Sequence, residues 1–438
     1  MPITSLYLTD FGPFEEIEFE FDRQVNVFTG PNNSGKSSVL LMLAELLVYP
    51  FTAPDKLYRS DRPEWKLRYS AGTQVKSAGG YLPSDPESFI AIFEVIGHTS
   101  FVPAQRSATD FRASGPSAKE DVEARTEKLA NMLARARPKM LREYGFEELR
   151  NATREMRSKE HPELKRRGDL ALAYSSSWVD DTEIVQKIID IDYTAYRQDR
   201  PEVRNVIDKI ISMVSEITEG YSVSFAGVGE DEGGLFPRIT TPAGTLPLDV
   251  LSQGTQSLIQ TVAHLMIGYG EYYEYSADLE QKPGVLLIDE IDAHLHPSWQ
   301  RRIIPTLIRH LPKLQIFCST HSPLMLAGLE SGQVQLLRRG QDGRISVSRN
   351  ESDIVGWSAD EILRNFMDVP TPTDVETAEH VTRLEELRHK ETLTPAESRE
   401  LEALRRAVGS ELFRGPMSTQ VEQFAQELKR ARNKRSAG

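Results

Sequence analysis

An eight-residue segment near the start of the chain has the residue types and the spacing of a phosphate-binding loop. Residues 30–37 read Gly-Pro-Asn-Asn-Ser-Gly-Lys-Ser and match the pattern G-x-x-x-x-G-K-[ST] at every fixed position. The glycines let the backbone curl so that N–H groups face the phosphates of a nucleoside triphosphate. Lys36 adds a positive charge, and the Ser37 hydroxyl is a ligand for Mg²⁺. We expect the nucleotide to be bound by Gly30, Pro31, Asn32, Asn33, Ser34, Gly35, Lys36, Ser37 and Ser38.

The segments on either side of this loop have the character that the site requires. Residues 25–28 read as a buried, apolar strand, and residues 38–47 read as a helix. The order strand, loop, helix places a helix N-terminus, with its partial positive charge, at the phosphates. The alternative is a glycine-rich turn that matches by chance, and the quality of both flanks argues against it.

Two adjacent carboxylates follow a second apolar run. Residues 285–288 are all apolar and lead directly into Asp289 and Glu290. A strand buried in a parallel sheet is continuously apolar, and open α/β sheets bind ligands at the carboxyl ends of their strands. Asp289 is therefore suited to hold Mg²⁺ together with Ser37. Glu290 is suited to the water that attacks the γ-phosphate, which makes it a catalytic candidate.

A histidine follows the next apolar strand. Residues 314–318 are followed by Ser-Thr-His-Ser-Pro, so His321 lies one strand after the acid pair, where it can contact the γ-phosphate. A lone histidine is usually structural, but this position favours a catalytic role. The single cysteine, Cys318, excludes an internal disulfide, and its apolar neighbours indicate a buried thiol.

Three further segments carry weaker signals. Residues 251–257 form a polar turn before an apolar helix at 258–267, which provides an anion-ready helix N-terminus. A short strand from residue 101 ends in Gln105 and Arg106, which either approach the γ-phosphate and its Mg²⁺ or form a surface turn. Residues 291–297 contain two histidines, which we assign to turn or interface roles because no other His or Cys stands at zinc-like spacing.

Composition limits the classes of function. With 438 residues, the chain exceeds the size of one simple core, so we expect one elaborated α/β domain or two to three subdomains. The chain has 52 Lys and Arg against 65 Asp and Glu, a net charge of −13, so any DNA contact must be local. No apolar run approaches the ~20 residues of a membrane span, and the first residues lack the plan of a signal peptide. We therefore expect a cytoplasmic protein without membrane contact.

Residues 117–220 read as a charged helical insertion. Its last helix carries a continuous apolar stripe, and we expect Gly220 to end that helix. Arginines between residues 135 and 167 form either a DNA-facing surface or a salt-bridged solvated face. We favour the solvated face because acidic residues are interleaved throughout. The stripe comprises Val203, Val206, Ile207, Ile210, Ile211, Val214 and Ile217.

Strands and turns are predicted in the remaining segments. Alternating apolar and polar residues predict two antiparallel strands at 3–8 and 17–21, with a turn at 10–14. Other strands are predicted at 89–96, at 221–225 and 235–240 around a turn at 230–234, and in a hairpin of 334–337 with 345–347.

After residue 350 the sequence predicts short helices. Helices at 374–391 and 396–409 are expected to be antiparallel, with Pro395 at a first helical position. The last ten residues are basic and either grip a phosphate backbone or an acidic partner, or form a solvated end, which we favour. Capping-box spacing joins Ser358 to Glu361, Thr373 to Glu376, Thr394 to Glu397 and Thr419 to Glu422. The basic residues are Lys429, Arg430, Arg432, Lys434 and Arg435.

Taken together, these motifs resemble the ATP-binding-cassette (ABC) ATPases of the SMC, RecF and OLD group, which are AAA family ATPases. The resemblance covers residues 1 to about 350. It implies an α/β fold: an ABC-ATPase head with a mixed sheet, a helical insertion and a helical C-terminal tail. The corresponding divisions are residues 1–116, 117–220, 221–350 and 351–438.

The resemblance also implies how the site works. It identifies residues 251–255 as a signature loop, residues 292–297 as a D-loop that adds Asp292 to the site, and His321 as a switch histidine. Members of the group hydrolyse ATP with Mg²⁺ and form head-to-tail dimers or higher homo-oligomers. In such a dimer, the signature loop of one subunit closes over the nucleotide held by Lys36 of the other. The signature residues are Ser252, Gln253 and Gly254, and Gln253 departs from the glycine of transporter cassettes.

The D-loop is similar to that of OLD-type and phage-defence ATPases. The helical tail is similar to that of Septu-type defence ATPases, which act beside an HNH nuclease. OLD nucleases carry a nuclease domain after the ATPase, whereas residues after 350 lack its Glu and Asp-x-Asp plan, so we expect the effector chemistry on a partner. A RecF-like DNA-repair ATPase is the first alternative. A transporter motor is disfavoured by the large insertion between Lys36 and Ser252, and a non-hydrolysing nucleotide-gated module by the presence of Glu290.

Overall fold

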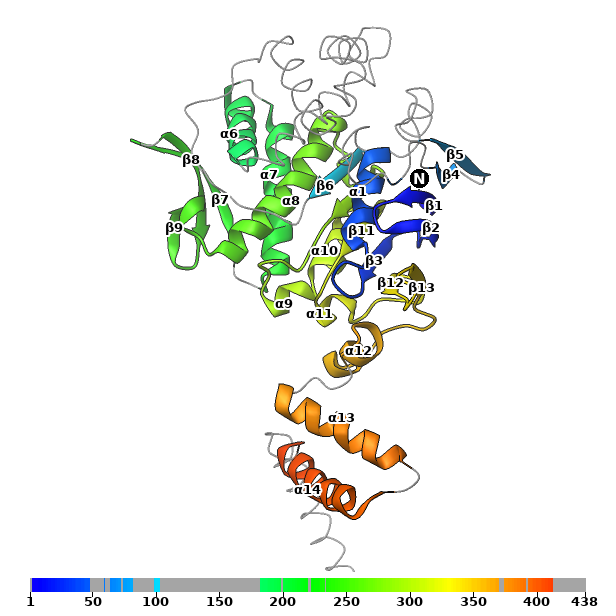
Figure 1. Cartoon of the computed structure of the whole chain (residues 1–438). Helices are drawn as coiled ribbons and strands as arrows, with labels where there is room; N and C mark the ends of the chain where they lie inside the picture. Colours follow the sequence, from blue (N-terminus) through cyan, green and yellow to red (C-terminus); the bar gives the residue numbers. More distant parts are fainter. Residues whose placement is uncertain are drawn as a thin grey trace, which may run out of the picture. The chain divides into compact units, whose positions relative to one another are not determined.

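The centre of the fold is a six-stranded mixed sheet with the order β13-β12-β3-β11-β10-β6 (Figure 1). The strands β12, β3, β11, β10 and β6 are parallel, and β13 is antiparallel to β12. Every residue of β3, β10 and β11 is buried, as in parallel strands covered on both faces. The predicted α/β class with a mixed sheet is thus confirmed. The strands are β3 (Val25–Thr29), β6 (His98–Val102), β10 (Gly284–Ile288), β11 (Leu314–Ser319), β12 (Val334–Arg339) and β13 (Ile345–Arg349).

The computed structural model describes residues 2–47, 59, 64–71, 74–81, 98–102, 182–197, 200–219, 222–232, 234–369, 374–390 and 393–412. The chain forms two compact units, Met1–Ile362 and Leu363–Gly438. The predicted strand at 89–96, the arginines of the insertion, Gln105, Arg106 and the basic residues of the last ten positions lie outside the described residues. Within the described residues, no helix combines the length and the apolar character of a membrane span.

A second sheet is antiparallel throughout and has the order β2-β1-β4-β5. The strands β1 (Ile3–Phe11) and β2 (Phe14–Glu20) are the pair predicted from alternation, and β1 extends three residues past its predicted end. The predicted turn at 10–14 is therefore too long, because only Gly12 and Pro13 separate the strands and Gly12 takes the left-handed conformation. The other strands, β4 (Glu64–Ala71) and β5 (Gln74–Tyr81), lie in a segment where no strand is predicted.

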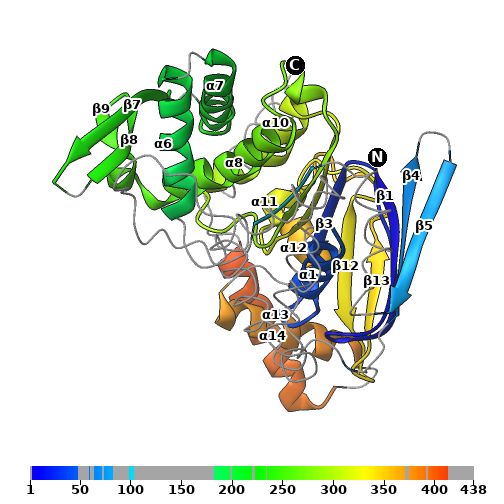
Figure 2. The ribbon, with the colours of Figure 1, turned by 90° about the horizontal axis from the view of Figure 1, so that it is seen from above.

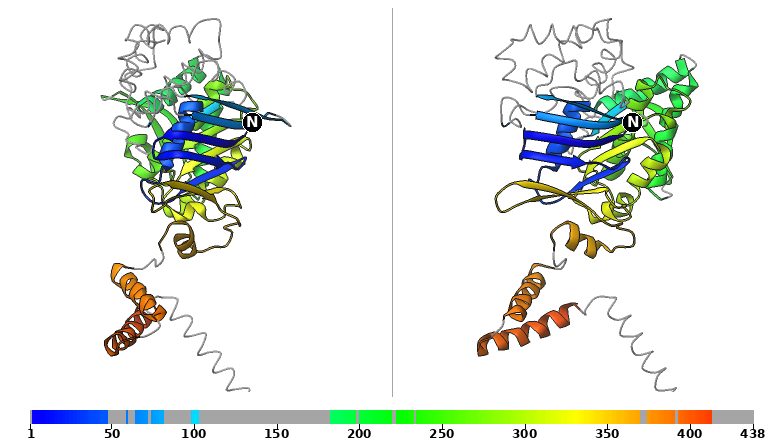
Figure 3. Two further views of the ribbon diagram at one scale, coloured as in Figure 1. Left: turned by 45° about the vertical axis from the view of Figure 1, so that its right-hand side comes forward. Right: turned by 90° about the vertical axis from the view of Figure 1, so that its right-hand side faces the viewer.

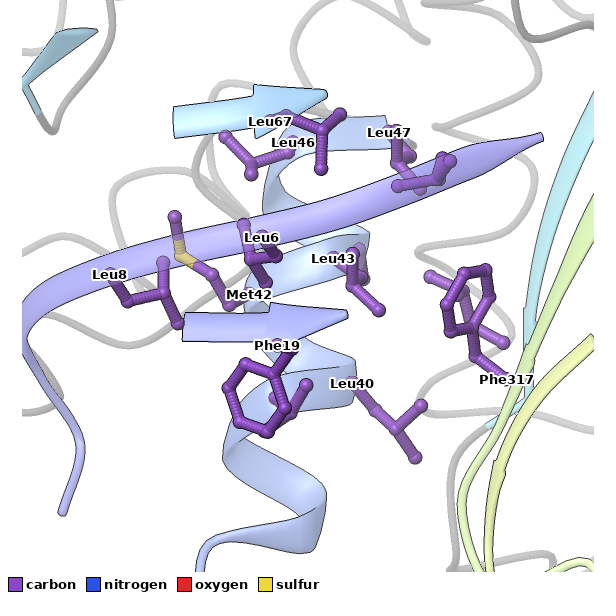
Figure 4. Close-up of a cluster of buried hydrophobic side chains, with 14 of the residues drawn as sticks. Leu6, Leu8, Phe19, Leu40, Met42, Leu43, Leu46, Leu47, Leu67 and Phe317 are labelled. Carbon is purple, nitrogen blue, oxygen red and sulfur yellow. The ribbon is translucent and has the colours of Figure 1, made fainter. Parts of the chain in front are cut away.

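Helix α1 (Lys36–Leu47) fills the space between the two sheets (Figure 4). Nine of its twelve residues are buried, so this helix is enclosed on nearly all sides rather than amphipathic. Because it is enclosed, the loop at its N-terminus is held in one place. The labelled side chains of this core are Leu6 and Leu8 of β1, Phe19 of β2, Leu67 of β4, Phe317 of β11, and Leu40, Met42, Leu43, Leu46 and Leu47 of α1.

Three further helices, α6 (Thr182–Arg197), α7 (Pro201–Ile217) and α8 (Gln253–Tyr272), pack against one another (Figure 2). Helix α8 also packs on β6 and joins this group to the central sheet. On the other side, α7 contacts α10 (Ile303–His310), where Glu216 pairs with Arg309 and His310.

The predicted apolar stripe of α7 is buried, which confirms its role as a packing face. Two details differ from the prediction. Ile211 is only half-buried, whereas Met213 is fully buried. The left-handed residue after the helix is Glu219, with φ 57°, and Gly220 lies outside the described residues.

A small antiparallel sheet with the order β7-β8-β9 lies next to α6 and α7. The strand predicted at 221–225 is displaced toward the C-terminus. Strand β7 begins at Ser224 and runs to Asp231, into the turn predicted at 230–234. The hairpin predicted after residue 334 is confirmed as β12 and β13. Cys318 is fully buried in β11, as predicted, and this burial raises the pKa of its thiol. The remaining bounds are β7 (Ser224–Asp231), β8 (Gly234–Thr241), β9 (Gly244–Pro247), α9 (Pro297–Gln300), α11 (Pro323–Leu326) and α12 (Ala359–Phe366).

The second unit contains an antiparallel helix pair, α13 (Val375–His389) and α14 (Pro395–Leu412), as predicted (Figure 3). Arg383 and Lys390 of the first helix region pair with Glu400 and Glu397 of α14, respectively. The capping boxes at Ser358 and Thr394 are present as predicted. The box predicted at Thr373 begins outside the described residues, and the N-cap of α13 is Asp374, whose carboxylate accepts a hydrogen bond from the N–H of Thr377.

The core around α1 makes a testable prediction about stability. Leu43 is fully buried, so Leu43→Ala removes packed methyl groups and should lower the free energy of unfolding by about 2–5 kcal/mol. Val75 on β5 is 65% exposed, and Val75→Ala should change it by less than about 0.5 kcal/mol. Urea unfolding of the full chain, followed by tryptophan fluorescence, measures both. Equal midpoints for the two variants would contradict the packing of Leu43 in this core.

Candidate nucleotide-binding site

The phosphate loop connects the carboxyl end of β3 to the N-terminus of α1. Gly30, Asn33 and Gly35 all have positive φ, at 140°, 61° and 97°. A Cβ atom on Gly30 would lie 2.2 Å from the carbonyl oxygen of Leu337, and one on Gly35 would lie 2.5 Å from Cζ of Phe14. Both glycines are therefore required by close approach as well as by backbone conformation.

Lys36 is folded back over the loop that precedes it. Its Nζ donates hydrogen bonds to the carbonyl oxygens of Gly30 and Pro31, both at 2.9 Å, and the residue is only 6% exposed. Burial lowers the pKa of Lys36, and the carboxylate of Asp289 is the strongest opposing influence. The ammonium group is thus fixed beside the loop.

A cavity of about 500 Å³ lies over this loop, within the size range of small-molecule sites. It brings together residues from the ends of β3, β10 and β11, because neighbouring parallel strands end at the same edge of a sheet. The predicted phosphate loop, acid pair and histidine therefore face one space. The lining residues are Asn32, Asn33, Ser34, Gly35, Lys36, Ser37, Ser38, Asp289, Glu290, Ser319 and His321.

The groups in this cavity fit a nucleoside triphosphate with Mg²⁺. The hydroxyl of Ser34 is buried and has no hydrogen-bond partner among the described residues, which marks a polar group that a ligand oxygen can satisfy. Ser37 and Asp289 both line the cavity and offer the oxygen ligands that Mg²⁺ prefers. Among the described residues, no group of three or more His, Cys, Asp or Glu could hold a metal, but Mg²⁺ bound with phosphates and water needs no such group.

Ser319, at the end of β11, organises the acid pair. Its Oγ donates a hydrogen bond to Oδ1 of Asp289 and accepts one from the N–H of Glu290 at 2.8 Å. Glu290 has φ 49°, which is uncommon for a residue with a side chain and costs on the order of 1–3 kcal/mol. The two hydrogen bonds, together with that from the N–H of Ile291 to the carbonyl of Ser319, hold this backbone in place. The side chain of Glu290 stays exposed at the cavity.

Hydrogen bonds to a carboxylate also join the loop of His321, after β11, to the loop that follows the acid pair, after β10. Oδ1 of Asp292 accepts hydrogen bonds from Oγ1 of Thr320 at 2.6 Å and from the N–H of His321 at 3.3 Å. The imidazole of His321 is exposed and lines the cavity, whereas Asp292 does not. No role is predicted for Ser319 or Thr320 from the sequence. The available signal is two hydroxyl residues at the end of a buried strand, directly before the histidine.

Arg339, on β12, is a further residue without a role predicted from the sequence. Its guanidinium donates to the carbonyl of Asn33 at 3.1 Å and to that of Gly343 at 2.9 Å. It therefore supports the left-handed turn of the phosphate loop from outside the cavity. No sequence pattern marks it, since an arginine on an exposed hairpin is common.

The predicted signature residues lie away from the cavity of their own chain. Ser252 caps α8, with its Oγ accepting from the N–H of Thr255 at 3.3 Å, and Gln253 begins the helix. Gly254 packs on the D-loop, where an added Cβ would lie 2.7 Å from the carbonyl oxygen of His294. None of the three lines the cavity.

The two D-loop histidines have positions typical of turns. His294 is exposed with φ 63°, and His296 caps α9 by accepting from the N–H of Ser298 through Nδ1. Gln105 and Arg106, the remaining predicted site residues, lie outside the described residues.

Comparison with known proteins finds relatives that match parts of this chain. The chain is 31% identical over 170 residues to "Septu protein PtuA" of Bacillus thuringiensis, covering 37% of this chain and 42% of that protein. It is 37% identical over 91 residues to "Retron Ec83 probable ATPase" of Escherichia coli, covering 21% of this chain and 17% of that protein. The chain thus spans less than half the length of these relatives.

A solved structure, "SMC head domain from Thermotoga maritima", covers 80% of this chain and all of its own, at 14% identity. Its TM-score of 0.38 is too low to bear on function. Residues 5–56 match the family model "AAA domain". Residues 106–327, half of the chain, match the model "AAA domain, putative AbiEii toxin, Type IV TA system". Consistent with the phosphate loop and the acid pair in one cavity, the chain belongs to this family of AAA-type ATPase domains.

Proposed function

We propose that this chain is a Mg²⁺-dependent ATPase that dimerises on ATP and acts as the sensor or conformational engine of a partner effector. The observation that carries the proposal is the single cavity that gathers the phosphate loop, the acid pair and His321. A phosphate site alone suits a binding protein. A carboxylate exposed beside that site supplies the base that hydrolysis requires.

Each residue has a distinct role in the proposed reaction. Lys36 and the loop N–H groups hold the β- and γ-phosphates, and Ser34 adds a hydroxyl. Ser37 and Asp289 would hold Mg²⁺, which neutralises charge on the phosphate oxygens. Glu290 orients a water and accepts its proton as the water oxygen bonds to the γ-phosphorus. The bond between the γ-phosphorus and the β,γ-bridging oxygen breaks, which releases ADP. His321 donates a hydrogen bond to a γ-phosphate oxygen.

The dimer is supported by the position of the signature residues. Ser252 and Gln253 are exposed at the N-terminus of a twenty-residue helix, and they do not reach the cavity of their own chain. A helix N-terminus favours anions. In a head-to-tail homodimer this terminus would meet the γ-phosphate bound by the other subunit, so that each site takes residues from two chains.

The place in phage defence rests on the relatives. Both carry names of defence systems, Septu and retron, and one is called an ATPase. We extend the defence role to this chain as part of the proposal, with the effector, such as an HNH nuclease, on a separate partner. DNA contact belongs to the same proposal.

The first prediction from the proposed function concerns nucleotide binding. Lys36→Ala removes the fixed positive charge of the loop, so affinity for ATP should fall at least ~10²-fold, the scale of lost charge-assisted hydrogen bonds. Lys66→Ala, an exposed lysine on β4 outside this cavity, is the matched control and should bind normally. Titration with a fluorescent ATP analogue measures both. Equal binding by the two variants would refute the phosphate site.

A second prediction separates chemistry from binding. Glu290→Gln keeps the shape of the side chain but cannot accept a proton, so hydrolysis should fall ~10²–10⁴-fold while ATP still binds. Release of phosphate and equilibrium binding, measured on the same preparation, give the two values. A variant that hydrolyses ATP at the normal rate would exclude Glu290 as the base.

A third prediction tests shared sites. Ser252→Arg places a bulky cation at the proposed interface, so each subunit should bind ATP but neither dimerise nor hydrolyse it. Mixed with Lys36→Ala subunits, it should recover part of the activity, because one of the two shared sites then has an intact Lys36 and an intact Ser252. Light scattering reports dimers, and phosphate release reports activity. Normal hydrolysis by monomeric Ser252→Arg would rule out the shared-site mechanism.

A further inference from the structure

We infer that Asp292 is a positioning residue that holds His321 at the cavity through a closed ring of hydrogen bonds. The ring joins the loop after β10 to the loop after β11, and its Asp292 also accepts a hydrogen bond from the N–H of His321. This inference rests on the proposed function, since it concerns the same site. The ring comprises Asp292, Thr320, Ser322 and Gln300.

One half of the ring consists of Asp292 and the threonine before the histidine. The hydroxyl of Thr320 is fully buried, donates to Oδ1 of Asp292 at 2.6 Å, and accepts from the N–H of Ser322 at 3.0 Å. The same carboxylate oxygen accepts from the N–H of His321. Hydrogen bonds to an ionised acceptor are about twice as strong as neutral ones. Both neighbours of His321, and its own N–H, are therefore fixed.

The other half returns through α9. Oγ of Ser322 donates to Oε1 of Gln300 at 2.6 Å. Nε2 of Gln300 donates to the carbonyl oxygens of Asp292 at 3.4 Å and Leu295 at 3.1 Å. Each member of the ring thus contacts the next, and residues 320–322, which have no regular secondary structure, are held by side chains instead.

The position of Asp292 favours an indirect role. Its carboxylate does not line the cavity, whereas the imidazole of His321 does. Removal of the Asp292 carboxylate therefore affects the cavity only through the position of His321. Burial lowers the pKa of Lys36, and the negative charge of Asp292, together with those of Asp289 and Glu290, opposes that shift. An experiment must separate this charge from the hydrogen bonds.

The test compares paired variants of the full chain. Asp292→Ala removes the acceptor, and Thr320→Val removes the donor at similar size, so both should lower kcat ~10-fold or more, with KM for ATP changed less than about twofold. Asp292→Asn keeps an acceptor oxygen but makes weaker, neutral hydrogen bonds, so it should lower kcat less than Asp292→Ala does, and Thr320→Ser keeps the hydroxyl and should stay near the wild-type kcat. If Asp292→Asn is as slow as Asp292→Ala, the charge rather than the hydrogen bonds is responsible, and the inference is overturned.

A double-mutant cycle shows whether the effect passes through the histidine. In a His321→Ala background, Asp292→Ala should lower kcat no further, because the residue it positions is already absent. Independent, multiplicative losses would overturn the inference. Unchanged nucleotide binding and thermal midpoint in each variant establish that the chain is folded.

A readout without activity distinguishes this inference from the proposed function. Amide hydrogen exchange of a peptide covering residues 319–324 should be faster in Asp292→Ala than in Asp292→Asn and in the wild-type protein. If the wild-type protein does not hydrolyse ATP, the proposed function fails, and exchange still reports whether Asp292 anchors this loop. Equal exchange in Asp292→Ala and the wild-type protein would refute the anchoring itself.

Discussion

The burial of α1 between the two sheets is the constraint on which the site depends. The phosphate loop enters from β3 and leaves into a helix that is enclosed by β1, β2 and β4 on one side and by the mixed sheet on the other. Neither glycine of the loop has room for a side chain, because Leu337 and Phe14 stand against them. The antiparallel sheet lines none of this cavity, yet it restricts the conformation of the loop, because Phe14 of β2 packs next to Gly35.

The strand order then brings the chemistry together. Because β3, β11 and β10 are parallel neighbours, the loops after them meet at one edge of the sheet. Ser319 and Thr320 use their hydroxyls to join these loops, through Asp289 and Asp292. Ser319 also accepts from the N–H of Glu290 and thereby stabilises the left-handed backbone of Glu290, which would otherwise be costly, while the carboxylate of Glu290 stays exposed. An ordered backbone is therefore compatible with an exposed carboxylate at the cavity.

The same chain carries a cavity and, elsewhere, a helix N-terminus suited to anions. Gly254 at that terminus packs on the carbonyl of His294, so the start of α8 and the D-loop form one surface. Under the proposed mechanism, a second subunit would contact both at once. The D-loop begins at Asp292, which also accepts a hydrogen bond from the N–H of His321. Formation of the dimer and the position of the histidine would therefore be linked through a short segment of the chain.

The sequence alone determined the phosphate loop, the acid pair, the histidine and the apolar strands before them, because each is a local pattern of consecutive residues or a single period. It also predicted α7 and the paired tail helices, for the same reason. Strands β4 and β5 escaped prediction because they lie in a Pro- and Gly-rich segment and take their order from pairing, β4 with β1 and β5 with β4. Only the tertiary structure decided which side chains support the site. Ser319 meets Asp289 across 30 residues, and Arg339 meets Asn33 across 306, and such contacts arise from strand order, which no local pattern encodes.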